Sequence, residues 1–173
     1  TAYLKCHYPS EFMAALLTSV LDNTDKVIEY SGECARLGIR VLPPDINISN
    51  GGFTADARGQ IRFGLNAVKS VGRNLVERIV EERREKPYAS LYDFCKRLHG
   101  TEINRRAVES MIKSGAFDNL EAKRRSMMDG VEGILKHHGV QLVGLHAAHG
   151  PLEDLRVVLP LPYLLAGEHA LEV

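Results

Sequence analysis

Apolar residues recur at spacings of three and four positions along most of the first 136 residues, a pattern typical of helices that pack through one face. After a helical run that begins at residue 2, the pattern predicts helices over residues 11–21, 24–37, 73–86, 91–98, 105–114 and 122–136. Ser10, Ser90 and Asn104 stand where side-chain N-caps are expected, and residues 22–24 break one helix and cap the next. The pattern therefore predicts a mainly helical fold.

Two short stretches depart from the helical period. Residues 39–42 form an apolar strand candidate that runs into Pro43 and Pro44, and the two prolines favour a stiff, extended connection. Residues 52–54 and 60–63 alternate on either side of a turn-forming segment, which predicts a β-hairpin. The predicted fold class is mainly α with a small β-hairpin, and the prolines predict a domain boundary.

A turn near residue 70 is the first candidate site. It joins a short apolar helix containing Leu65 and Val68 to the helix that starts at residue 73, and this order predicts a helix-hairpin-helix. Small residues let the backbone approach a ligand, and the N-terminus of the second helix presents N–H groups and a positive dipole end to an anion. The natural anion is a nucleic-acid phosphate. The candidate DNA-binding residues here are Lys69, Ser70, Val71, Gly72, Arg73 and Asn74.

A second candidate turn lies about 43 residues further along the chain, where a helix ends in Lys113, Ser114 and Gly115. Two such turns would let one domain hold a nucleic-acid backbone at two points. The alternative is that each glycine only closes a connection between packed helices.

Charge is distributed unevenly, although the formal net charge is zero. Residues 58–125 contain 16 Lys and Arg against 9 Asp and Glu, a net of +7, whereas the remainder contains 6 against 13, a net of −7. A basic block between acidic flanks predicts a local site for a polyanion.

Composition favours aliphatic helix packing, because 45% of the residues are hydrophobic, 6% are aromatic and none is Trp. The three widely spaced cysteines, Cys6, Cys34 and Cys95, predict free thiols in a reducing compartment. The first residues lack a signal-peptide pattern, and the apolar stretch 157–167 is short and broken by prolines. We therefore expect a cytoplasmic protein.

Two other functions remain open from the residues alone. The chain could be a helical protein-interaction module in which the hairpins serve only packing. It could also be a metal-binding hydrolase that uses His137, His138, His146 and His149, but no carboxylate or Cys lies at ligand spacing inside this cluster. Residues 137–173 have no assigned fold.

Several segments occur in a familiar order. They include Tyr8-Pro9-Ser10-Glu11-Phe12-Met13, Asp22-Asn23-Thr24-Asp25-Lys26-Val27, Leu42-Pro43-Pro44-Asp45-Ile46-Asn47, Leu91-Tyr92-Asp93-Phe94-Cys95 and Ile112-Lys113-Ser114-Gly115-Ala116-Phe117-Asp118. This series, over residues 2 to about 128, resembles the bacterial replicative DNA polymerase III alpha subunit, a C-family DNA polymerase.

The resemblance implies a division of the chain. Residues 1–42 would be the C-terminal part of the fingers region, 43–63 a linker with the β-hairpin, and 64–136 a tandem helix-hairpin-helix module, with 137–173 unassigned. In that family the module holds duplex DNA by its sugar-phosphate backbone, so the implied partners are double-stranded DNA and the remaining domains of the subunit. Family members usually have Gly where this chain has Ser70.

The resemblance also implies what this chain lacks. The family's palm carboxylates, which hold two Mg²⁺ ions for phosphoryl transfer, would lie upstream, so we expect no cofactor here and no polymerisation by this chain alone. The family carries a sliding-clamp-binding peptide of the type Gln-x-x-Leu-Phe. Gln141–Leu145 matches that peptide poorly, since Gly144 replaces an apolar residue.

Overall fold

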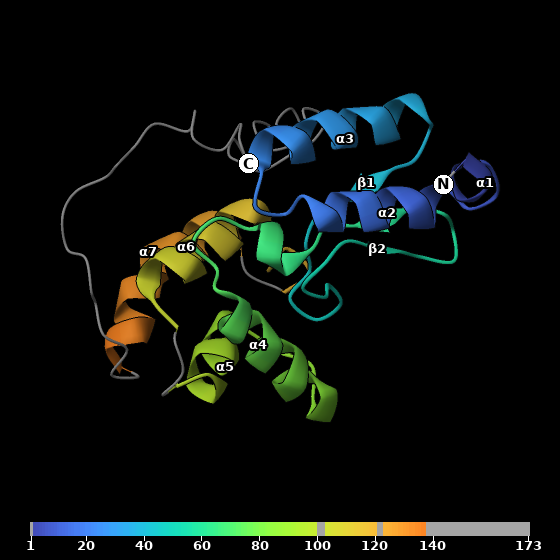
Figure 1. The fold of residues 1–173 in the computed structure, drawn as a ribbon. Coiled ribbons are helices and arrows are strands. Elements are labelled where there is room, and N and C mark those ends of the chain that lie inside the picture. Colours follow the sequence, from blue (N-terminus) through green and yellow to red (C-terminus); the bar gives the residue numbers. More distant parts are fainter. Residues whose placement is uncertain (1, 100–102, 121–122, 138–173) are drawn as a thin grey trace.

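The computed structural model describes residues 2–99, 103–120 and 123–137 (Figure 1). Its helices are α1 (Ala2–His7), α2 (Pro9–Ser19), α3 (Thr24–Arg36), the 3-10 helix η1 (Leu65–Ala67), α4 (Arg73–Glu85), α5 (Leu91–Arg97), α6 (Arg105–Ser114) and α7 (Arg124–His137). Its strands are β1 (Val41–Leu42), β2 (Thr54–Ala55) and β3 (Ile61–Arg62). The predicted fold class, mainly α with a small β-hairpin, is confirmed.

Side-chain caps begin three of the helices. Asn23 accepts a hydrogen bond from the N–H of Lys26, and Ser90 and Asn104 cap α5 and α6 in the same way. The prediction for Ser10 is wrong, because α2 begins at Pro9 and its N-cap position is Tyr8. Ser10 is buried inside the helix, where its hydroxyl donates to the carbonyl of Gly59 at 2.7 Å.

The sheet has three strands in the order β1-β3-β2. β2 and β3 form the predicted antiparallel hairpin, with Thr54 opposite Arg62. β1 joins β3 in parallel, pairing Val41 with Ile61, a contact that the local pattern did not predict. α2 and α3 pack against this sheet, and Figure 1 shows them with α1 at one end of the molecule, while α4 to α7 form the other.

A single hydrophobic core connects the two ends. It fully buries Leu17 of α2, Ile79 of α4 and Phe63, which follows β3. Edge-to-face aromatic contacts continue the core toward the C-terminal helices, with ring centroids 5.1 Å apart for Phe94 and Phe117. None of the helices in the described ranges is long and apolar enough to cross a lipid bilayer.

The segment after β1 is packed between the helices. Asp45 is only 3% exposed, and its carboxylate accepts a hydrogen bond from Asn119. The N–H of Ile46 donates to the carbonyl of Ala116 at 2.8 Å, while Arg83 of α4 donates to the carbonyl of Ile46 at 3.1 Å. This segment therefore connects α4 to the turn that follows α6.

Candidate nucleic-acid interface

The first candidate turn connects η1 to α4 through residues 68–72. The side chains of Val68 and Val71 are buried, at 2% and 8% exposure, and hold the turn onto the core. Lys69 and Ser70 lie between the two valines, Gly72 follows Val71, and all three are exposed. Two apolar side chains thus anchor the turn while the positions between and beside them face solvent.

Ser70 has a backbone φ of +64°, and it is the one non-glycine with a positive φ among the described residues. This left-handed conformation is unfavourable for a residue with a Cβ and favours glycine. Gly72, by contrast, has an ordinary extended backbone, with φ −75° and ψ 150°. The backbone freedom predicted for this turn is therefore needed at residue 70.

The N-terminus of α4 differs from that of its capped neighbours. Gly72 is the N-cap and provides no side-chain acceptor, and the first turn contains no acidic residue. In α3 and α5, by contrast, a capping side chain is accompanied by Asp25 or Asp93 in the first turn. The positive end of the α4 dipole is therefore not compensated by side chains of its own first turn.

Basic and polar side chains surround this helix end. Lys69, Arg73 and Asn74 are all exposed. Lys69 makes no ion pair with any residue that the structure describes. Arg73 pairs with Asp22, with 3.0 Å between Nη2 and Oδ2. The arrangement offers an anion backbone donors and at least one cation with no competing carboxylate.

The second candidate turn differs from the first because it is buried. Ser114 is 1% exposed, and its hydroxyl donates to the carbonyl of Met111 at 2.9 Å. Gly115 is also buried and has φ +85°, the conformation of a helix C-terminal glycine. Its N–H donates to the carbonyl of Ile112 at 3.0 Å. Lys113 alone of the three predicted residues here is exposed.

An ion pair lies over Gly115. Arg124 donates to both carboxylate oxygens of Asp118, with 2.6 Å between Nε and Oδ1. This interaction raises the pKa of Arg124 further. A Cβ added to Gly115 would lie 2.6 Å from Arg124 Nη2 and 2.8 Å from Asp118 Oδ2. The glycine therefore lets this ion pair approach the backbone, and the geometry gives no support to phosphate contacts by Ser114 and Gly115.

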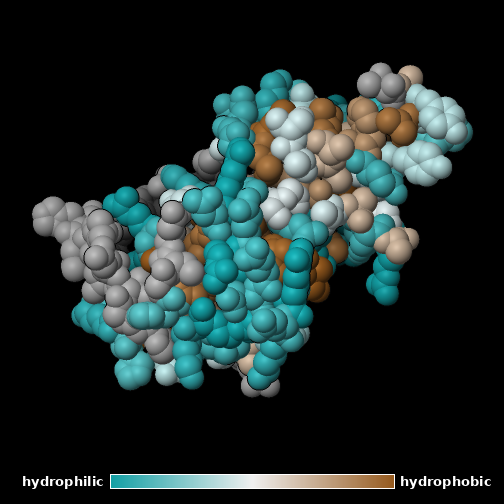
Figure 2. All heavy atoms as spheres, turned by 60° about the horizontal axis from the view of Figure 1, so that its bottom comes forward, coloured by the Kyte–Doolittle hydropathy of each residue, from teal (hydrophilic) through white to brown (hydrophobic). Residues whose placement is uncertain are grey.

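Part of the predicted basic block is neutralised within the protein. Arg78, Arg97 and Arg105 form ion pairs with glutamates at 3.2, 3.7 and 2.5 Å. Several other basic side chains make no ion pair within the described ranges, namely Lys69, Arg84, Lys86, Lys96, Arg106, Lys113 and Arg125. Figure 2 shows that hydrophilic residues dominate the lower part of the molecule in that view.

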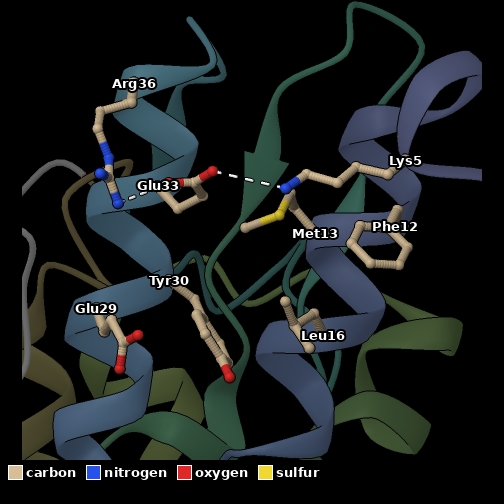
Figure 3. A pocket seen from close by; sticks show the side chains of 8 residues that line it. All are labelled: Lys5, Phe12, Met13, Leu16, Glu29, Tyr30, Glu33 and Arg36. Carbon is tan, nitrogen blue, oxygen red and sulfur yellow. Dashed lines mark ion pairs between the residues drawn. The ribbon is translucent and has the colours of Figure 1, made fainter. Parts of the chain in front are cut away.

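A groove of about 180 Å³ lies at the other end of the molecule, between α1, α2 and α3. Phe12, Leu16 and Tyr30 line it, and an ion pair of 3.7 Å between Lys5 and Glu33 spans its rim (Figure 3). Next to it, α1 buries none of its residues. Charged side chains make up half of the lining of the groove, namely Lys5, Glu29, Glu33 and Arg36.

Two other predictions fall largely outside the described residues. His137 is the last residue of α7, whereas the other histidines of the alternative metal site lie beyond it, as does the peptide Gln141–Leu145. Among the residues with described positions, no three His, Cys, Asp or Glu side chains are grouped so that they could hold a metal ion.

Comparison with known proteins identifies the class of the module. Residues 38–127, more than half of the chain, match the sequence model of the helix-hairpin-helix motif. The chain therefore belongs to the helix-hairpin-helix family.

It is also similar to the DNA polymerase III subunit alpha of several bacteria. The identity is 44% over 137 residues for Haemophilus influenzae, 47% over 137 residues for Xylella fastidiosa and 43% over 159 residues for Escherichia coli. These alignments cover 79–89% of this chain but only 12–14% of each relative. The predicted resemblance to the alpha subunit is confirmed.

Proposed function

We propose that this chain binds the sugar-phosphate backbone of double-stranded DNA, without reading base sequence, as a segment of a replicative polymerase alpha subunit. The observation that carries the proposal is the N-terminus of α4, which has no capping side chain and no acidic residue in its first turn. It lies in an exposed turn of a helix-hairpin-helix protein, beside Lys69 and Arg73. Phosphate is the anion that such a helix end accepts.

The contacts would divide by chemistry. Backbone N–H groups of the turn and the first residues of α4 would donate to phosphate oxygens, while Lys69 and Arg73 would add charge and release counterions. Lys113 would contribute a further charge from the end of α6. We assign Ser114 and Gly115 to shaping the second turn, since their polar groups bond within the protein.

The rest of the proposal follows from the relatives, of which this chain spans about one eighth. The remaining domains of an alpha subunit would be its partners and would supply the palm carboxylates and Mg²⁺ for nucleotidyl transfer. We therefore expect no polymerase activity from this chain alone, and binding to the sliding clamp stays a prediction.

The test is DNA binding by the 173-residue chain, measured by fluorescence anisotropy on two duplexes of unrelated sequence over a range of salt. If about five phosphates are neutralised, log K should fall against log salt with a slope of roughly −4 to −5, equally for both duplexes. Reversing the charge at Lys69 and at Lys113 should weaken binding in each case. Arg84→Glu is the matched control, because Arg84 is exposed on the same helix as the turn but about 16 Å further along it.

The alternative is a helical protein-interaction module, which the exposed residues of α1 and the side chains of Phe12 and Leu16 in the neighbouring groove favour. In that case DNA retention would not depend on salt, and the variants at Lys69 and Lys113 would behave like the control. Either result would refute DNA-backbone binding through this turn.

A further inference from the structure

The loop between α2 and α3 places the carboxylate of Asp22 beside the turn at residues 68–72, which we propose binds DNA. Asp22 lies 51 residues before Arg73, and its Oδ2 and Oδ1 are 3.0 and 3.3 Å from Arg73 Nη2. Both side chains are exposed, at 88% for Asp22 and 67% for Arg73. An acidic side chain from the predicted fingers segment is thus paired with a predicted phosphate-binding residue.

Hydrogen bonds on either side hold the loop that presents Asp22. The N–H of Val20 donates to the carbonyl of Leu17 at 3.3 Å, and the N–H of Asn23 donates to the carbonyl of Val20 at 2.8 Å. Asn23 then caps α3 through the N–H of Lys26 at 3.1 Å. These hydrogen bonds define the path of the backbone on both sides of Asp22, and this path places its carboxylate beside Arg73.

We propose that Asp22 is an internal competitor of DNA phosphate for Arg73, and that it weakens the grip of the first turn on the backbone. The proposal rests on the proposed function, because it needs DNA to approach this turn. A carboxylate offers a guanidinium the same kind of charged oxygen acceptor that a phosphate offers. Arg73 can therefore pass from one acceptor to the other without becoming unpaired.

Asp22 should lower the affinity for DNA whether or not its ion pair with Arg73 opens. If Arg73 leaves Asp22, the favourable contact is lost and the released carboxylate is exposed near the DNA. If Arg73 keeps Asp22 and binds phosphate through its other N–H groups, the two anions lie on the same guanidinium and repel each other. Because both side chains are exposed to water, the effect should be moderate, about threefold to tenfold in affinity.

A weaker grip suits a protein that binds any DNA sequence. Such a protein must exchange one phosphate for the next as it moves along the duplex, and an internal acceptor keeps Arg73 satisfied between contacts. Asp22 would thereby shorten the life of each contact.

The experiment compares Asp22→Asn with the unchanged 173-residue chain in the same anisotropy assay. We expect DNA affinity to rise about threefold to tenfold and the salt slope to steepen by up to about one. Asp25→Asn is the matched control, because it removes the same charge from a nearby exposed residue that makes no ion pair within the described ranges. The control should change affinity by less than about twofold.

A double-mutant cycle tests whether Asp22 acts through Arg73. In an Arg73→Gln background, Asp22→Asn should no longer increase affinity beyond the change seen with Asp25→Asn. Circular dichroism should show that Asp22→Asn and Asp25→Asn are folded. Asp22→Ser provides a second neutral side chain at position 22.

The outcomes separate this inference from the proposed function. If the unchanged chain shows no salt-dependent DNA binding, the proposed function itself is refuted. If the unchanged chain binds but Asp22→Asn and Asp22→Ser leave affinity unchanged, competition by Asp22 is refuted. If Asp22→Asn and Asp22→Ser both reduce affinity, Asp22 would instead position Arg73. If Asp22→Asn increases affinity equally in the Arg73→Gln background, Asp22 would act only through its general charge. Either result overturns the inference.

Discussion

Arg83 offers the clearest test of how the segment between β1 and β2 is held. Its guanidinium reaches back from α4 and donates to the carbonyls of Ile46 at 3.1 Å, Ser49 at 2.6 Å and Ile48 at 3.2 Å. It also donates to the side chain of Asn50 at 2.8 Å. Burial lowers the pKa of Arg83 from its ordinary value, yet these acceptors stabilise the guanidinium where it lies. We therefore predict that Arg83→Ala destabilises the fold substantially.

The size of the loss follows from which acceptors water can reach. Ile48 and Asn50 are exposed, so water can replace the guanidinium there. Ile46 and Ser49 are 1% and 0% exposed, and their carbonyls would lose a charged donor. At about 1–1.5 kcal/mol for each buried acceptor, the free energy of unfolding should fall by about 2–3 kcal/mol. Arg83→Lys should recover only part of this, because a lysine lacks the planar fork.

The measurement is urea unfolding followed by circular dichroism, where this loss corresponds to a midpoint lower by about 1 M or more. Arg84→Ala is the matched control, since the adjacent side chain is exposed and makes no ion pair among the described residues. It should change the free energy of unfolding by no more than about 0.5 kcal/mol. Equal effects for the two variants would refute the assignment of Arg83 as the clamp of this segment.

Two further predictions concern the turn and the thiols. Ser70→Gly should raise the free energy of unfolding by about 0.5–1 kcal/mol, because glycine relieves the positive φ; a decrease in urea unfolding would contradict this. Burial raises the pKa of Cys34 to about 11 and that of Cys95 to about 12, so a thiol reagent at pH 8 should modify exposed Cys6 rapidly and the other two only on unfolding. Equal labelling of all three cysteines would refute the burial of Cys34 and Cys95. Because folding raises the pKa of these two thiols, their protonated forms contribute fully to stability below pH 9, and this contribution is lost as the pH rises toward 12.

Most of the local structure could be predicted from the sequence because it depends on residues within one or two helical turns. Ser90 and Asn104 cap their helices as predicted, and the β2–β3 hairpin lies where the alternation placed it. Ser10 shows where local rules are ambiguous. A serine next to a proline at a helix start can cap it or lie in its first turn, and here its contact with Gly59 accompanies the second arrangement.

The candidate site was only partly predictable. Both turns end in similar small residues, but the first exposes Gly72 whereas the second buries Gly115. Long-range contacts account for the burial, since the turn after α6 packs against the segment that contains Ile46. Arg124 and Asp118, which lie over Gly115, gave no local signal, because a separation of six residues is not a helical contact spacing.

By itself, the sequence determined the helices, their caps, the hairpin and the presence of a helix-hairpin-helix turn, because short-range spacing and backbone preferences specify these features. Only the tertiary structure decided which turn faces solvent and which basic side chains are already paired. The contact between Asp22 and Arg73 joins residues 51 positions apart. No periodic pattern reports such a contact, because the packing of α2, α3 and α4 around the core brings the two side chains together.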